Sequence, residues 1–126
     1  MLKFKTLMTI KAVVCVVLGI PILLVPKFFY GIFGVTLDAA GVFPAWEYGA
    51  SLMGNAMVTW YARYAKESKG RRAIIKGMTV YNTIGFIVTV IAILNGTVNA
   101  LGWGAAAIYL FFTLGFGYFW LNPPTP

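Results

Sequence analysis

Glu47, Ser51 and Asn55 form the row of polar residues in this sequence that is best placed for chemistry. They recur at every fourth position of an apolar segment, so in a helix they share one face, which should point into the protein. If the following apolar segments are antiparallel helices, Asn82 and Thr113 fall at about the depth of Asn55. Such a polar layer fits a ligand head or an ion. It also fits hydrogen bonds between packed helices, which we favour because amides link helices without a ligand.

Glu47 is the single acidic residue inside a predicted membrane span. A proton-relay role would require it to lie beside a water-filled path. Counting from Pro44, however, places it in the first turn of its helix, where a carboxylate favours the positive end of the helix dipole and reaches interfacial water. We therefore interpret Glu47 as a helix-end residue, with a site role as the alternative.

Residues for catalysis and metal binding are scarce. The chain has no histidine, one cysteine (Cys15) and three acidic residues. These provide no ligand set for haem, zinc or a di-iron centre, and no nucleophile with a neighbouring base. The sequence therefore predicts no metal and no cofactor, and it favours a non-catalytic role while leaving enzymatic activity open.

The composition is that of a membrane protein. Of the 126 residues, 60% are hydrophobic and only 10% are charged, and the mean hydropathy is +0.84. So few ionisable side chains cannot cover a soluble domain, whereas lipid accepts apolar side chains that face outward. The net charge of +7 does not indicate nucleic-acid binding, because the basic residues are confined to the ends of apolar segments.

Four apolar segments predict an all-α fold, a four-helix transmembrane bundle in a single domain of residues 1–126. The spans are expected at 8–25, 44–64, 73–94 and 101–121, with an outer loop at 26–43 and a cytoplasmic loop at 65–72. Each is long enough to cross the hydrocarbon core at about 1.5 Å per residue. The first segment is not expected to be a cleaved signal peptide, because Pro26 and aromatic residues follow it instead of a small-residue cleavage site. The short connection 95–100 makes the last two spans antiparallel neighbours.

Basic residues predict the orientation in the membrane. Lys3, Lys5 and Lys11 lie at the amino end, and six more surround the connection between the second and third spans, whereas the other side holds only Lys27. This bias places both termini in the cytoplasm and favours a bacterial or archaeal inner membrane. The six could also contact anionic lipids, although topology alone explains them. They are Arg63, Lys66, Lys69, Arg71, Arg72 and Lys76.

The outer loop begins with an aromatic segment that contains Phe28, Phe29, Tyr30 and Phe33. It is too aromatic for bulk water and too short to cross the bilayer, so we expect an interfacial segment. It could form a lid or cradle for a lipid tail or a quinone ring. The favoured interpretation is an aromatic belt that caps the bundle.

Glycine, proline and aromatic spacing along most of the chain resembles that of small bacterial four-helix inner-membrane proteins of the DoxX-like type. The matching positions are Gly19, Pro26, Phe29, Phe33-Gly34, Trp60-Tyr61-Ala62-Arg63, Asn95-Gly96 and Leu101-Gly102-Trp103. The resemblance implies the four-helix fold and an association with quinone-linked sulfur oxidation. No catalytic motif matches on this chain.

Three functions follow from these features. The first is a non-catalytic accessory or assembly subunit that packs against itself, as a homo-oligomer, or against a larger membrane complex. The second is a bundle that binds a quinone, a lipid or an ion at the polar face of the second span. The third is a subunit of a quinone-linked oxidoreductase. The first is favoured because small residues occur on more than one span and allow close helix packing.

Overall fold

The computed structural model describes residues 2–123, and the regular elements in this part are all α-helices. The predicted all-α class is therefore confirmed. Met1 and residues 124–126 of the expected domain lie outside the described residues. The helices are α1 (Phe4–Leu24), α2 (Pro26–Ile32), α3 (Ala39–Tyr61), α4 (Lys69–Leu94) and α5 (Gly102–Leu121).

Three of these helices, α1, α4 and α5, are long and apolar enough to cross a membrane. The remaining long helix, α3, has 23 residues but is less apolar, because it includes Glu47 and Asn55 together with several glycines. The chain thus has the helices of a membrane protein. By length and composition, three of them qualify as spans, whereas four spans were predicted.

Local capping explains why α3 and α4 begin earlier than hydropathy predicts. The Asp38 side chain accepts a hydrogen bond from the Gly41 backbone N–H at 2.7 Å and starts α3 five residues before Pro44. The Ser68 hydroxyl accepts from the Arg71 N–H at 3.2 Å and starts α4 at Lys69 instead of residue 73. Side chains of this kind satisfy N–H groups that have no partner within the helix. Hydropathy marks the apolar part of a helix, whereas the cap marks its first turn.

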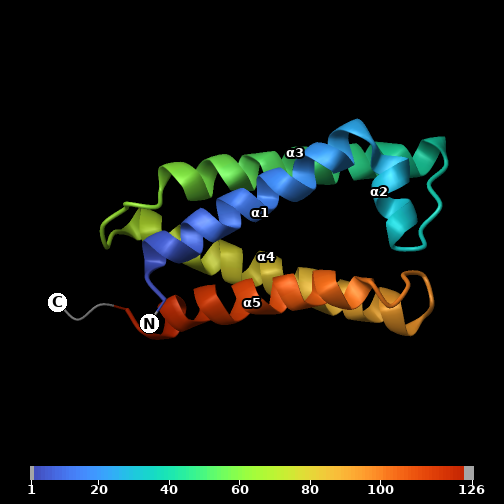
Figure 1. The fold of residues 1–126 in the computed structure, drawn as a ribbon. Helices are drawn as coiled ribbons and strands as arrows, with labels where there is room; N and C mark the ends of the chain where they lie inside the picture. The colour runs from blue at the N-terminus through green and yellow to red at the C-terminus, as the bar shows by residue number, and fades with distance from the viewer. Residues whose placement is uncertain (1, 124–126) are drawn as a thin grey trace.

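The long helices form two antiparallel pairs, α1 with α3 and α4 with α5 (Figure 1). The α4–α5 pair is the one that the short connection predicts. In the described residues the backbone of α3 does not come close to that of α4 or α5, and α1 packs on α5 near one end. The two pairs converge at the end of the molecule where α1 begins and α5 ends, and they separate toward the other end, where α2 lies (Figure 1).

Two apolar clusters hold this arrangement. One lies between the pairs at the converging end and combines residues of α1, α4 and α5: Phe4, Leu7, Met8, Ile75, Met78, Phe112 and Phe116. The other lies between α1 and α3, where Gly49 allows the helices to approach: a Cβ atom at this position would lie 2.8 Å from Cγ of Leu23. Helix α1 therefore belongs to both clusters and joins the two pairs.

Candidate functional site

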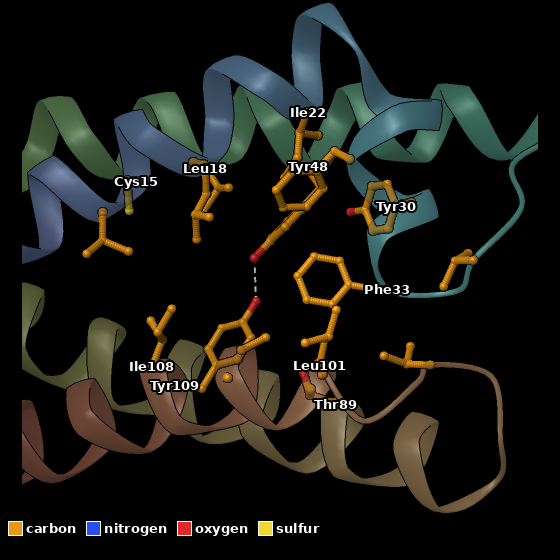
Figure 2. Close-up of a pocket in the computed structure, with 18 of the residues that line it drawn as sticks. Cys15, Leu18, Ile22, Tyr30, Phe33, Tyr48, Thr89, Leu101, Ile108 and Tyr109 are labelled. Carbon is orange, nitrogen blue, oxygen red and sulfur yellow. Dashed lines mark hydrogen bonds between the residues drawn. The ribbon is translucent and has the colours of Figure 1, made fainter.

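A cavity of about 610 Å³ lies between the two helix pairs where they separate. Figure 2 shows Leu18 and Ile22 of α1 on one side, with Ile108 and Leu101 facing them from the α5 side. Most of the lining is aliphatic or aromatic, and side chains of all five helices contribute. A cavity of this size and character is typical of a small-molecule binding site.

One end of the cavity is polar and buried. Lys11 is 3% exposed and Asn82 is fully buried, and the Lys11 Nζ donates a hydrogen bond to the Asn82 Oδ1 at 3.1 Å. The Asn82 Nδ2 donates to the Met78 carbonyl at 2.8 Å, which leaves the amide oxygen directed toward the lysine. The Lys11 Nζ also lies 4.9 Å from the centre of the Tyr81 ring and 4.7 Å from that of Phe112. These ring faces attract the ammonium group.

Lys11 lacks an acidic partner within residues 2–123. The ion pair found in this part of the chain joins Arg72 to Glu67, at 3.8 Å, and does not involve Lys11. The same residues contain no group of three acidic or cysteine side chains that could hold a metal. A lysine ammonium has three donors, and Asn82 accepts from one of them. A buried cation without a counter-ion is costly in an apolar site. Lys11 therefore stands out as the charged residue that helix packing alone does not explain.

Tyrosines from three helices surround the middle of the cavity. The hydroxyls of Tyr48 on α3 and Tyr109 on α5 form a hydrogen bond across the gap between the two pairs (Figure 2). The Tyr81 ring packs edge-on against that of Tyr109 at 6.3 Å. Its hydroxyl is buried without a hydrogen-bond partner. The cavity thus contains one bridging phenol pair with the Tyr81 phenol beside it.

Gly85 makes room for one of these rings. A Cβ atom at position 85 would lie 2.3 Å from Cε1 of Tyr109, which is closer than atoms can approach. The absence of a side chain on α4 at this point therefore fixes how Tyr109 lies against the helix and directs its hydroxyl toward Tyr48.

Helix α2 lies at the wide end of the cavity. Phe29, Tyr30 and Phe33 line the cavity, whereas Phe28 is 71% exposed. Burial raises the pKa of the Tyr30 hydroxyl, and nearby Tyr109 adds to the effect, so Tyr30 stays neutral. The aromatic segment predicted for the outer loop is thus a short helix, and three of its four named residues face the cavity.

The turn between α4 and α5 holds α2 in place. The Asn99 Nδ2 donates to the Ile32 carbonyl at 3.0 Å, and the Asn99 backbone N–H donates to the Phe33 carbonyl at 2.9 Å. Gly34, which has a φ of +77° that other residues rarely adopt, packs against the same asparagine. These contacts connect the two helix pairs at the end opposite the apolar cluster.

The structure does not bring together the polar residues predicted to form a layer. Glu47 and Ser51 are exposed, and the Asn55 Nδ2 donates to the Ser51 carbonyl of its own helix at 2.9 Å. Asn82 lies on α4, whose backbone is distant from that of α3, and its partner is Lys11. Thr113 has a buried hydroxyl without a partner. The expectation that this face of α3 points into the protein is wrong for Glu47 and Ser51, because α3 packs on α1 through its small residues, such as Ala45 and Gly49.

The basic residues at the converging end divide into two groups. The arginines bind parts of the protein: Arg72 donates to the carbonyls of Phe119 and Trp120 at 2.9 and 2.8 Å, and Arg71 lies 4.0 Å from the centre of the Phe4 ring. Arg63 similarly stacks on Trp60 at 3.7 Å. The lysines are exposed, namely Lys66, Lys69 and Lys76. Lipid contact by this cluster stays a prediction.

Lys11 is the site residue that sequence reasoning assigned to the wrong environment. It counts toward the basic amino end in the sequence, but the structure places it in α1 with its side chain buried at the polar end of the cavity. The signal was present, because an ionisable residue that interrupts an apolar span is costly and marks a site more often than a terminus. The tyrosines gave no such signal, since aromatic residues are frequent throughout this chain.

No family model, curated protein or solved structure matches this chain. The resemblance to DoxX-like proteins stays a prediction.

Proposed function

We propose that this chain is a four-helix membrane protein that binds an amphipathic, lipid-like molecule between the α1–α3 and α4–α5 pairs. One observation carries the proposal: the apolar cavity of about 610 Å³ has a buried lysine and asparagine at one end. Its volume falls within the roughly 300–1,000 Å³ of small-molecule sites. An apolar body with a polar end matches a ligand that has a tail and a head.

The proposal includes α3 as the fourth span. Its 23 residues at about 1.5 Å each extend about 35 Å, which is enough to cross the hydrocarbon core. It runs antiparallel to α1 over the length of that helix (Figure 1), so a bilayer that surrounds α1 also surrounds α3. Pairing with α1 lets α3 be less apolar than a helix that faces lipid on every side.

We place the converging end in the cytoplasm of a bacterial or archaeal cell. Eight of the ten lysines and arginines lie toward this end, since only Lys27 and the buried Lys11 do not. The positive-inside tendency then favours cytoplasmic termini. The cavity would extend from Lys11, near the middle of the membrane, toward α2 at the outer surface.

The cavity favours a ligand-binding role over an accessory-subunit role. Exposed apolar helices are required of every membrane protein, so they do not discriminate between the two functions. A cavity lined by all five helices, with a short aromatic helix at its wide end, is not required for assembly. A quinone remains one candidate ligand, and with it the role in a quinone-linked oxidoreductase.

Purification from the native membrane in a mild detergent tests the proposal, with mass spectrometry of every molecule that accompanies the protein. Leu18→Trp fills the cavity, and Val17→Trp is its matched control, because Val17 is the neighbouring residue and is 61% exposed. We expect one amphiphile per chain in the wild type and in Val17→Trp, and its loss in Leu18→Trp. Equal amounts in all three, or none in the wild type, would exclude the cavity as the site. A stoichiometric protein partner without a bound amphiphile would instead support the accessory-subunit role.

A further inference from the structure

The environment of Lys11 specifies the charge of the missing partner. Lys11 is 3% exposed, and within residues 2–123 its ammonium group meets an amide oxygen, the Cys15 thiol and two ring faces but no carboxylate. Neutral acceptors and rings only partly offset the cost of burying a positive charge. The group that would complete this environment is an anion that enters from the cavity, which Lys11 lines.

A second donor lies close to Lys11 in the cavity. The Tyr81 hydroxyl is buried without a partner, and it belongs to the ring that Lys11 faces at 4.9 Å. Tyr81 and Asn82 are neighbours on α4, and both line the cavity. An ammonium and a phenol offer two donors to one acceptor group with two oxygens.

The single positive charge in the cavity lining indicates which class of anion fits. A carboxylate carries one negative charge and two acceptor oxygens, which match one ammonium and one phenol. A phosphate monoester carries about −1.5 to −2 charges and three acceptor oxygens, and within the described lining Lys11 is the single cation. A quinone carbonyl accepts hydrogen bonds but leaves the ammonium without a counter-charge.

The rest of the cavity specifies a hydrocarbon chain. From Lys11, the lining continues along α1 through Cys15 and Leu18 to Ile22, a rise of about 16 Å at about 1.5 Å per residue. Beyond Ile22 the lining is the aromatic face of α2. We propose that the cavity binds a long-chain fatty acid, with its carboxylate on Lys11 and Tyr81 and its tail directed toward α2. This assignment rests on the function proposed above.

Binding of four probes to the purified wild-type protein tests the assignment directly. Palmitate, hexadecanol, hexadecyl phosphate and decylubiquinone are titrated separately against delipidated protein in a non-ionic detergent, and bound molecules are counted by native mass spectrometry. We expect palmitate to bind at least about tenfold more tightly than hexadecanol, because a charge-assisted hydrogen bond to a buried partner is lost in the alcohol. Because this comparison uses only the wild type, it does not depend on the folding of any variant.

Substitution of Lys11 assigns the head-group site. Lys11→Met keeps the length of the side chain without its charge, and we expect it to weaken palmitate binding about tenfold or more while hexadecanol binding stays the same. The matched control is Lys27→Met, which removes an exposed lysine outside the cavity. It should bind palmitate as the wild type does.

Each other outcome has a defined meaning. Equal binding of palmitate and hexadecanol, or wild-type palmitate binding by Lys11→Met, would overturn the carboxylate site. Tighter binding of hexadecyl phosphate or decylubiquinone than of palmitate would also overturn it. In these cases, loss of the bound probe in Leu18→Trp would leave the proposed cavity function intact. Failure of all four probes to bind would overturn the fatty-acid assignment and would count against the proposed function as well.

Discussion

Lys11 is held in an apolar site by Asn82 and by the faces of Tyr81 and Phe112. These contacts join α1 to α4 and α5, so a residue that is unfavourable in lipid also links the two helix pairs. Removing one partner of a buried polar contact costs more than removing both, because the group that remains keeps its desolvation penalty. At the scale of single residues, the effects of substituting Lys11 and Asn82 on the free energy of unfolding should therefore be strongly coupled.

Asn82→Leu should lower the stability of the protein by about 1.5–3 kcal/mol, because it leaves the Lys11 ammonium without its hydrogen-bond acceptor. Adding Lys11→Met should restore part of the loss, since Met and Leu are both apolar. Thermal unfolding in detergent, followed by the fluorescence of the four tryptophans, measures both variants. A double variant that is as unstable as the sum of the two single variants would show that the contact does not couple the helices.

At the scale of elements, glycines determine how closely the helices of each pair approach. Gly49 admits Leu23 between α1 and α3, and Gly85 admits Tyr109 between α4 and α5. Gly54, also on α3, has no such neighbour, because no side chain or other helix lies within 4 Å of a Cβ built at this position. Which glycine is needed depends on the face that packs.

Gly85→Ala should destabilise the protein by about 1–3 kcal/mol, because the new Cβ would overlap the Tyr109 ring. Displacement of this ring would also break the hydrogen bond between Tyr48 and Tyr109. The matched control is Gly77→Ala in the same helix, where a Cβ has open space. The control should be neutral or stabilising by up to about 1 kcal/mol, as alanine favours a helix. Equal unfolding temperatures for the two variants would contradict this account.

At the scale of the whole molecule, two connections hold the helix pairs at opposite ends. The apolar cluster around Phe112 and Phe116 joins them at the converging end, and Asn99 joins α2 to the α4–α5 turn at the other. Between these connections the backbone of α3 stays apart from those of α4 and α5. The cavity occupies this space, and the Tyr48–Tyr109 hydrogen bond crosses it. The long outer loop therefore has a structural role, since its helix spans the gap between the pairs.

The proposed topology places the two ends of α3 on opposite sides of the membrane. Thr36→Cys and Lys66→Cys add exposed thiols just before and just after this helix, and the native Cys15 is buried. In intact cells, a membrane-impermeant maleimide should label Thr36→Cys and not Lys66→Cys, because Lys66 lies at the end assigned to the cytoplasm. Permeabilised cells should show labelling of both variants, and the wild type is the control. Labelling of both in intact cells, or of neither, would show that α3 does not cross.

The amino-acid sequence by itself determined the all-α class, the apolar character of three spans and the pairing of α4 with α5. These features depend on local properties: hydropathy averaged over a helix, and a connection too short to allow any other neighbour. The aromatic segment of the outer loop and the buried polarity of Asn82 were also recognisable, because both stand out from the residues around them.

Only the tertiary structure decided that Lys11 meets Asn82, 71 residues away, and that the polar row of α3 faces outward. On a helix in lipid, both faces are apolar enough to pack against another helix. Hydropathy therefore does not identify which face is buried in the protein. That choice depends on where glycines and large side chains from distant helices fit together, as Gly49 does with Leu23 and Gly85 with Tyr109. The cavity arises from the same fit, because it is the space that remains where the two pairs separate.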